Sequence, residues 1–421
     1  MFRISCRCVI LILIGVFIIG FAQIVSAQKR EIVVWTIWKP QFDETVVNPF
    51  NAQSKDVTVR HEYIPGHDAM VQKLTAAITG GNPPDIAITD CIFTRRFAVT
   101  GQVICAEDLI KSQGGIKKED IFPVLREFST INGKFYALPF TSNDIILYYN
   151  VRLFKEVGLD PNKPPKTWDD LVAYGEKLTN PSKNQFGLGI PFFDSYFEIP
   201  SWDWQVFNYQ NGGKFLSEDY TKAYLNTSEA IEALQFWVDL VHKYKITPPQ
   251  EPQEAFARGL VAMRIDGSWM LSPEGWGYPA TMKDPFRTAI LPYKKKPATN
   301  IGGEHFLLFK STPEREKAAW EFLKYALSPE VDARFCIPGG YLPTTRSAQA
   351  SNTWKEYLRK DPRVKVAMDS LRYGYARPAV PQYYEISKTI AEAIQEAITL
   401  KATPKEALDE ANAKIEALLK R

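Results

Sequence analysis

The side chains that most often carry out catalysis or bind metals are scattered along this 421-residue chain. The histidines are His61, His67, His242 and His305, and none has the spacing of a metal-binding pair. The sequence lacks the HExxH, GxSxG, CxxC and GxxxxGK motifs of common catalytic and phosphate-binding sites. We therefore expect no metal and no cofactor. A pair of carboxylates without a motif stays open as a catalytic arrangement.

A tryptophan ends the stretch "FARGLVAMRIDGSW", residues 256–269. Val261, Met263 and Ile265 alternate with small or charged residues, as in a half-buried strand, and the "DGS" that follows has the composition of a turn. Trp269 is therefore expected just beyond the end of a strand. Large aromatic residues mostly fill cores, so this stretch by itself favours a core position for Trp269 over contact with a ligand.

The N-terminal part of the chain alternates between predicted strands and helices. Apolar runs at residues 31–38, 57–65 and 83–90 predict strands, and residues 67–81 predict a helix that ends at glycine. This alternation indicates a parallel sheet, and such sheets bind ligands beyond the carboxyl ends of their strands. Trp38 and Asp90 fall at two of these ends, where ligand contact and a structural role in a turn or cap are both consistent with the pattern.

The later part of the chain is richer in predicted helices. Thr167 and Asp170 have the spacing of a capping box, and Ser311 and Glu314 form a similar pair. An apolar stripe in residues 228–245 is typical of a helix face packed into a core. The predicted helices are residues 167–178, 228–245, 311–327 and, in two parts divided near Thr403, the segment 384–419.

Residues 1–27 have the features of a cleavable secretory signal. Arg3 and Arg7 precede an apolar run from Val9 to Phe21, which is too short to cross a bilayer, and the small residues of "VSA" end at Ala27. An uncleaved anchor is the alternative. No cysteine follows the run where a lipid could be attached, since Cys6 and Cys8 lie inside the predicted signal. We therefore expect export to the periplasm.

The charge and the remaining cysteines set further limits. Removing 27 of 421 residues leaves 394, and losing Arg3 and Arg7 without any acid lowers the formal charge from +3 to +1. This near-neutral balance argues against nucleic acid as the partner, because a nucleic-acid-binding surface needs an excess of basic residues. Cys91, Cys105 and Cys336 remain, and they allow either a Cys91–Cys105 disulfide or three buried thiols.

Five blocks of sequence together carry a family resemblance. They are "GNPPDIAITD"; "GKFYALPF" with "LYYN", "LFKEVGL" and "PPKTWDDL"; "FARGLVAMRIDGSW"; "IGGEHFLLFKSTPEREKAAWEFLKYALSPE"; and "GGYLPTTR". In this order, and over nearly the whole chain after residue 27, they resemble the sugar-binding branch of the bacterial extracellular solute-binding proteins (family 1), the group that includes maltose-binding protein.

The resemblance implies an α/β protein with two lobes, crossover strands between them and a ligand cleft. The lobes of the family are discontinuous, so we expect residues 28–142 and 288–340 in lobe one, and residues 143–287 and 341–421 in lobe two. The crossovers are expected near residues 138–144 and 289–294. The implied function is that of a monomeric receptor, not an enzyme, which hands a sugar or small oligosaccharide to the membrane permease of an ABC importer.

The resemblance also implies a set of ligand-binding residues. The family's tryptophan on the cleft wall matches Trp269, which moves the expectation for this residue from the core to the ligand. A sugar has C–H groups on its ring faces and hydroxyls at its rim, so its site needs flat aromatic rings and planar polar partners. The expected aromatic residues are Trp38, Trp202, Trp269, Tyr341 and Tyr384, and the expected polar residues are Asp90, Asn143, Glu304 and Arg346.

One position departs from the resemblance. Asn143 stands where maltose-binding protein has an acid, so the same sugar is not implied. Asp194 and Asp203 lie in the aromatic segment 191–204 and are further candidates for ligand contact, while Phe192, Phe193 and Phe197 suit either the cleft wall or the core.

Two other functions stay open. An exported glycoside hydrolase or lyase would also line a cleft with tryptophans, and Asp90 and Glu304 would then be its carboxylate pair. A receptor for a phosphorylated or otherwise charged solute would need more than one arginine in the cleft, or a glycine-rich helix N-terminus facing the ligand.

Overall fold

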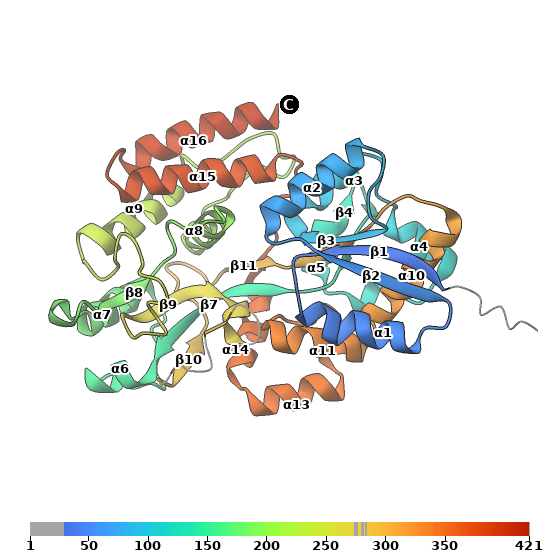
Figure 1. Ribbon diagram of the computed structural model, residues 1–421. Helices are drawn as coiled ribbons and strands as arrows, with labels where there is room; N and C mark the ends of the chain where they lie inside the picture. Colours follow the sequence, from blue (N-terminus) through green and yellow to red (C-terminus); the bar gives the residue numbers. More distant parts are fainter. Residues whose placement is uncertain (1–28, 273–276, 279–281, 283, 421) are drawn as a thin grey trace, which may run out of the picture.

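The computed structural model describes residues 29–272, 277–278, 282 and 284–420, and Figure 1 shows them as two lobes side by side. The predicted signal sequence at residues 1–27, with Cys6 and Cys8, lies outside the described residues. Within the described ranges, no helix is both long and apolar enough to cross a membrane.

The first lobe is built around a sheet with the strand order β2-β1-β3-β12-β6. β1 (Arg30–Thr36) pairs in parallel with β2 (Val57–Tyr63) on one side and with β3 (Ile86–Asp90) on the other. The three predicted N-terminal strands are therefore confirmed, with their parallel direction. Trp38 lies two residues beyond β1, and Asp90 is the last residue of β3.

Two strands from later in the chain complete this sheet. β12 (Glu304–Leu308) lies antiparallel between β3 and the short β6 (Leu138–Pro139), and its register places Glu304 opposite Asp90. Helices α2 (His67–Thr79) and α10 (Pro313–Ala326) contact β3 and β1 respectively, so the apolar side chains of these strands are buried.

The second lobe contains a sheet with the order β13-β11-β7-β9-β8, to which β10 adds by pairing with β7. Every residue of β7 is buried, since this strand lies at the centre of the sheet. The strands are β7 (Asn143–Asn150), β8 (Phe186–Gly189), β9 (Val261–Gly267), β10 (Phe286–Ala289), β11 (Thr299–Gly302) and β13 (Gly374–Tyr375). Outside both sheets, β4 (Thr130–Ile131) pairs with β5 (Lys134–Phe135).

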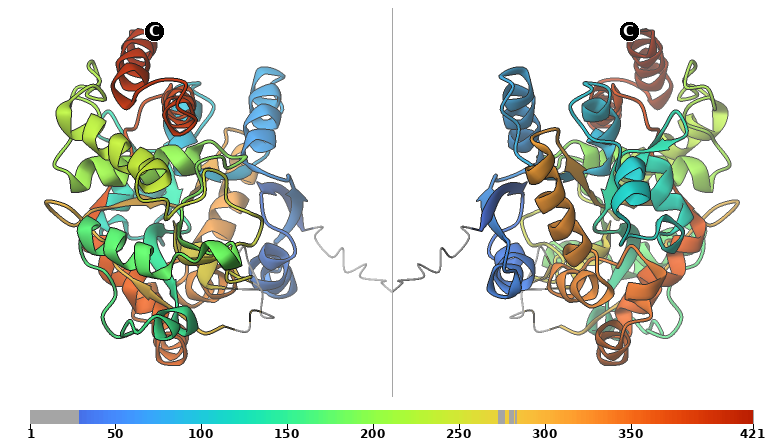
Figure 2. Two further views of the ribbon diagram at one scale, coloured as in Figure 1. Left: turned by 90° about the vertical axis from the view of Figure 1, so that its left-hand side faces the viewer. Right: turned by 90° about the vertical axis from the view of Figure 1, so that its right-hand side faces the viewer.

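Helices cover the second sheet and form one edge of the molecule. α7 (Trp168–Leu178) contacts β8, and α8 (Glu198–Gln210) packs against α9 (Ser228–His242) and α15 (Tyr383–Ile398). Figure 2 shows α15 and α16 (Pro404–Leu419), in red, side by side at that edge. The remaining helices are α1 (Asn48–Gln53), α3 (Thr94–Ala98), α4 (Ala106–Gln113), α5 (Pro123–Ser129), α6 (Val151–Glu156), α11 (Pro329–Gly339), α12 (Arg346–Gln349), α13 (Asn352–Lys360) and α14 (Arg363–Ser370).

Local sequence signals account for several helix boundaries. Thr167 and Asp170 form the predicted capping box of α7, in which each side chain accepts a hydrogen bond from the other residue's backbone N–H. The cap predicted at Ser311 is wrong by one residue, because Thr312 precedes Pro313 and its hydroxyl accepts from Arg315 N. The apolar stripe of α9 is in the core, as predicted: Leu234, Trp237 and Val241 are buried.

The chain crosses between the two sheets at adjacent points. The first crossing follows β6 and ends at Asn143, within the predicted segment 138–144. Another lies at Gly303, because Gly302 pairs with Asn143 in the second sheet while Glu304 pairs with Asp90 in the first. This crossing was predicted near residues 289–294. It lies later in the chain, because β11 still belongs to the second sheet. Ser142 also pairs with Leu342, so a later segment passes the same point.

Candidate ligand-binding site

A cavity of about 710 Å³ lies between the lobes and is lined by residues of both. The first lobe contributes the residues at the N-terminus of α2 and Asp90 at the end of β3, and the second contributes the loop before α8 and the end of β9. Asn143, Gly303 and Glu304 line it from the crossings. The volume is within the range of pockets that bury small organic ligands, about 300–1,000 Å³.

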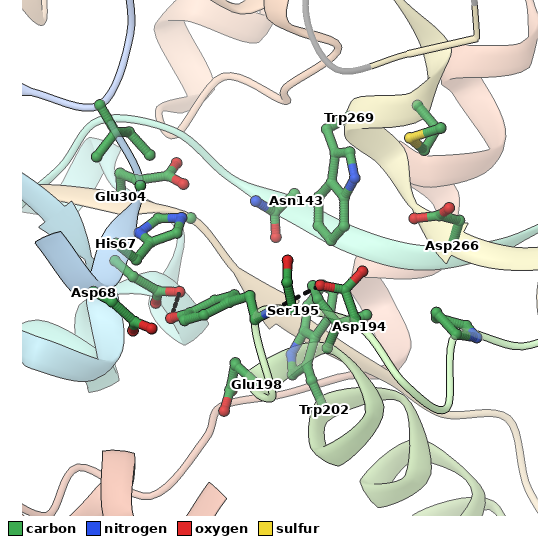
Figure 3. Close-up of a pocket in the computed structure, with 18 of the residues that line it drawn as sticks. His67, Asp68, Asn143, Asp194, Ser195, Glu198, Trp202, Asp266, Trp269 and Glu304 are labelled. Carbon is green, nitrogen blue, oxygen red and sulfur yellow. Dashed lines mark hydrogen bonds between the residues drawn. The ribbon is translucent and has the colours of Figure 1, made fainter. Parts of the chain in front are cut away.

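Two tryptophans form an aromatic wall of this cavity. The rings of Trp202 and Trp269 are stacked, with centroids 5.5 Å apart and planes 19° from parallel. Trp202 is only 2 % exposed, whereas Trp269 is half-buried. Figure 3 shows both rings beside Asn143, with Glu304 and His67 on one side of the cavity and Asp194 and Asp266 on the other.

The end of β9 explains the position of Trp269. Gly267 ends the strand, and a Cβ at this residue would lie 2.1 Å from the Trp269 ring, so only glycine lets the indole fold back over the strand end. Trp269 then sits in a short helical turn, Ser268–Leu271. The prediction from the strand-and-turn pattern is confirmed, and the half-buried ring borders the cavity.

Arg377 is a buried cation that joins the two lobes. Its Nη1 donates to Oε1 of Glu198 at 2.6 Å, and its Nη2 donates to Oδ1 of Asp90 at 3.2 Å. The guanidinium also lies over the Trp202 ring, 5.5 Å from its centroid. Burial tends to raise the pKa of Asp90, but Arg377 and His67 outweigh it and hold that pKa below its usual value.

The two glutamates of the cavity have raised pKa values. Burial, with a smaller effect of Asp90, raises the pKa of Glu304 to about 8, although Thr141 donates a short hydrogen bond to its Oε2. Burial likewise raises the pKa of Glu198 to about 7, against the opposing charge of Arg377. Glu304 is therefore mostly protonated at neutral pH, so it can donate a hydrogen bond as well as accept one.

Several contacts close one side of the cavity by joining the lobes directly. The Tyr196 hydroxyl donates to Oδ2 of Asp90 at 3.3 Å, and the Tyr196 ring is stacked on His67, with centroids 4.8 Å apart. Farther out, the Tyr384 hydroxyl donates to Oδ1 of Asp68 at 2.7 Å. These contacts connect the loop before α8 and the start of α15 to the end of β3 and the N-terminal end of α2.

The residues predicted from the sequence fall into two groups. Those that line the cavity are Asp90, Asn143, Trp202, Trp269, Glu304 and Tyr341. Trp38, Arg346 and Tyr384 do not line it. Trp38 is buried behind Tyr341 and donates from Nε1 to its hydroxyl at 3.1 Å, so it supports the wall from outside. The Arg346 guanidinium lies over the Phe122 ring, 5.0 Å from its centroid.

The segment 191–204 is also divided. Asp194 lines the cavity, whereas Asp203 is buried and does not. Phe192 is buried and stacks edge-on against Trp237, so it belongs to the core, while Phe193 is exposed.

Sequence reasoning missed Arg264, Asp266, Glu198, His67 and Arg377, all of which line the cavity. Arg264 and Asp266 occupy alternate positions of β9, and this alternation was the one sequence signal that they share a face. Arg377 has no local signal, since its partners Asp90 and Glu198 lie far away in the sequence.

The three cysteines are buried free thiols, so the structure favours that alternative over a disulfide between Cys91 and Cys105. Cys91 lies beside the cavity and its Sγ accepts from Nη2 of Arg377 at 2.9 Å. Across the described ranges, no group of three or more His, Cys, Asp or Glu side chains is placed to hold a metal ion.

Comparisons with known proteins agree with this architecture. A family model described as "Bacterial extracellular solute-binding protein" matches residues 45–362. The chain is similar to the cyclic α-maltosyl-1,6-maltose binding protein of Arthrobacter globiformis, a crystal structure with 31 % identity and a TM-score of 0.80, covering 93 % of this chain and 99 % of that one.

Two curated relatives are similar over most of their length. The maltotriose-binding protein of Pyrococcus abyssi is 24 % identical over 417 residues, which cover 95 % of this chain and 82 % of the relative. The sn-glycerol-3-phosphate-binding periplasmic protein UgpB of Escherichia coli O1:K1 is 25 % identical over 430 residues, covering 96 % of each.

Proposed function

We propose that this chain, which belongs to the bacterial extracellular solute-binding protein family, binds a sugar or short oligosaccharide between its lobes and delivers it to the permease of an ABC importer. The observation that carries the proposal is the stacked pair of Trp202 and Trp269 on a cavity that also presents Asp90, Asn143 and Glu304. The aromatic face suits the C–H groups of a sugar ring, and the carboxyl and carboxamide groups suit its hydroxyls.

The two carboxyl groups of Glu304 and Asp90 also support a hydroxylated ligand. Because the pKa of Glu304 is raised to about 8, its carboxyl group can donate a hydrogen bond at neutral pH, whereas the ionised Asp90 carboxylate only accepts. A hydroxyl group both donates and accepts, so a polyol suits both carboxyl groups within one cavity.

A phosphorylated ligand is the second candidate, since the sequence criterion for it is met in part. Arg264 and Arg377 both line the cavity, and so does Gly66 at the N-terminal end of α2. However, Arg377 is paired with Asp90 and Glu198, and Nε of Arg264 lies 3.1 Å from Asp266 and 3.6 Å from Glu251. A phosphate would meet these carboxylates as well as the guanidinium groups, so we favour a ligand without one.

The division into two lobes remains part of the proposal, with two borders changed. Residues that follow Tyr341 contact the first lobe, because Thr345 pairs with Ile121 and Ser347 N donates to Asp120. We assign residues 288–302 to lobe two, because β10 and β11 both pair with β7. The signal sequence at residues 1–27, release into the periplasm and a monomeric state remain part of the proposal. The export that the family implies supports the first two.

A thermal-shift screen with mono-, di- and trisaccharides, polyols and sn-glycerol 3-phosphate tests this function. A cognate ligand at about 100 times its Kd adds roughly 2.7 kcal/mol to the free energy of unfolding, which is measurable as a rise in melting temperature. We expect a rise with a sugar and none with the phosphate ester. A rise with the phosphate ester alone would favour the second candidate.

The same protein incubated with a mixed oligosaccharide pool tests for catalysis. Receptors deplete their ligand from solution without products, so no new reducing ends are expected. Reducing ends that appear with the wild-type chain and disappear with Asp90→Asn or Glu304→Gln would establish a hydrolase instead.

A further inference from the structure

We propose that the ligand is a sugar or polyol that carries a protonated amine, and that the amine binds beside Asp194, Asp266 and the face of Trp269. This inference rests on the proposed function and narrows its ligand class. It follows from the balance of charge in the cavity, from the surroundings of these carboxyl groups and from the exposed aromatic face next to them.

Carboxyl groups outnumber cationic groups around the cavity. Among the described residues that line it, the guanidinium groups are those of Arg264 and Arg377, and the carboxyl groups are those of Asp68, Asp90, Asp194, Glu198, Asp266 and Glu304. Each guanidinium is already shared between two carboxyl groups. Glu304 is mostly protonated at neutral pH and Glu198 has a pKa of about 7, but the aspartates alone still outnumber the guanidinium groups. A ligand that supplies positive charge would therefore be bound more favourably than a neutral one of the same shape.

The shortage of positive charge is greatest on the side of Asp194 and Asp266, which Figure 3 shows together near Trp269. Asp194 is exposed, and its Oδ1 accepts from the backbone N–H of Tyr196 at 2.8 Å. Within the described ranges, no lysine, arginine or histidine lies within 4.0 Å of its carboxylate. Asp266 shares Arg264 with Glu251.

Buried oxygens behind this wall lack hydrogen-bond donors. Oδ2 of Asp203, which is 2 % exposed, has no partner among the described residues, and neither does either carboxyl oxygen of Glu251, whose side chain is 9 % exposed. A single guanidinium, that of Arg264, faces Asp203, Glu251 and Asp266 together. Burial raises the pKa of each of these three carboxyl groups, so an ammonium group beside Asp266 would stabilise its ionised form and supply a hydrogen-bond donor.

The aromatic face of Trp269 completes the proposed binding site for the amine. The Trp269 ring is half-buried and lines the cavity, and its stacking on Trp202 fixes its orientation. A cation over an indole is attracted by the negative face of the ring, and carboxylates beside the ring strengthen the binding.

Isothermal titration with matched sugars tests this inference. Glucose, galactose, mannose and cellobiose would each be compared with the form in which an amine replaces one hydroxyl and with the N-acetylated form, which keeps the nitrogen but not its charge. We expect an amine to bind about tenfold more tightly than its neutral parent, and N-acetylation to abolish the gain.

Asp194→Asn separates charge from shape, because asparagine can still accept from Tyr196 N. It should weaken binding of the amine about fivefold more than binding of the neutral parent. Asp409→Asn on the exposed α16 removes the same charge from a residue that does not line the cavity, so it should change neither affinity.

The outcomes distinguish this inference from the proposed function. If neutral sugars bind as tightly as their amines, or Asp194→Asn weakens both equally, the inference fails and the proposed function stands. If no sugar of either kind binds, both fail.

Discussion

The indole of Trp269 lies on that of Trp202, with centroids 5.5 Å apart and planes 19° from parallel, yet the two residues differ in exposure. Trp202 is anchored in α8, and its backbone carbonyl accepts from Nδ2 of Asn300 at 2.7 Å. Trp269 lies over it at the cavity. One tryptophan of the pair therefore serves packing, and the other is free to meet a ligand.

Trp269→Ala should weaken sugar binding by about 1–3 kcal/mol, the usual loss when an aromatic stacking surface is removed. The melting temperature of the ligand-free protein should change little, because the ring is half-buried. Trp202→Ala is the matched variant and should destabilise the fold by about 3–5 kcal/mol, as expected for a core aromatic residue. Titration calorimetry and urea unfolding measure the two effects. Severe unfolding of Trp269→Ala with unchanged affinity would show that it too is a core residue.

Glu304 predicts how stability depends on pH. Its folded-state pKa of about 8 lies above its usual value of 4.5, so the folded chain binds a proton more tightly than the unfolded chain does. Stability is then highest below the unfolded pKa and falls as pH rises through the window from about 4.5 to 8. Glu304→Gln keeps an acceptor for Thr141 and removes this loss. The variant should match the wild type at pH 5 and exceed it at pH 9 in urea unfolding.

One result of the urea unfolding would contradict the prediction for Glu304. A wild type that loses no stability relative to Glu304→Gln between pH 5 and pH 9 would mean that the carboxyl group ionises without cost. In that case water or a nearby cation must solvate it.

The contacts of Tyr196 and Tyr384 predict an effect on closure. Both hydroxyls donate across the lobes, to Asp90 and Asp68, so these bonds must break when the lobes separate. A double variant with Tyr196→Phe and Tyr384→Phe should populate the open state more and bind ligand several-fold more weakly, because closure must then be driven by the ligand. Small-angle scattering should give a larger radius of gyration without ligand, and compaction when the cognate sugar is added.

Tyr174→Phe is the control for closure. Its hydroxyl donates to the Lys163 carbonyl within the second lobe, so its loss should leave both the radius of gyration and the affinity unchanged. Wild-type values for the double variant would rule out these hydroxyls as contacts that hold the lobes together.

Gly303 is predicted to be irreplaceable at the crossing between the sheets. Its φ is 138°, and a Cβ would lie 2.0 Å from the backbone oxygen of Thr141, which cannot move without disturbing the neighbouring crossing. Gly303→Ala should cost about 3 kcal/mol or more. Gly133→Ala, where φ is 77° and the space is open, should cost about 1 kcal/mol from backbone strain alone. Urea unfolding compares them, and equal losses would contradict the clash at the crossing.

How far the sequence predicts this protein depends on the distance between interacting residues. The strands β1 to β3 and the capping box of Thr167 were predictable because their signals lie within a few residues. Trp269 could be placed because strand, turn and tryptophan are contiguous. Arg377 could not, since its role appears only when Asp90 and Glu198 approach from distant segments.

Arg346 illustrates the same limit of prediction from sequence, because it was expected at the site and does not line the cavity. Its residue type suited a sugar site, but Arg346 is the first residue of α12, after the cap Thr345, and its guanidinium lies over the Phe122 ring. Residue type alone therefore gave a candidate that does not line the cavity. The crossing at Gly303 was displaced in the prediction for a related reason, because no local signal tells which sheet β11 joins.

The position of β12 between β3 and β6 affects when the first sheet can form during synthesis. A ribosome has made residue 308 of 421 before the first sheet can receive its inner strand, although β1, β2 and β3 emerge long before. Until then the buried edge of β3 has no neighbour, and pairing over so long a separation is slow. The first sheet therefore cannot be completed until synthesis has reached residue 308, so the first lobe folds late relative to the synthesis of its first three strands.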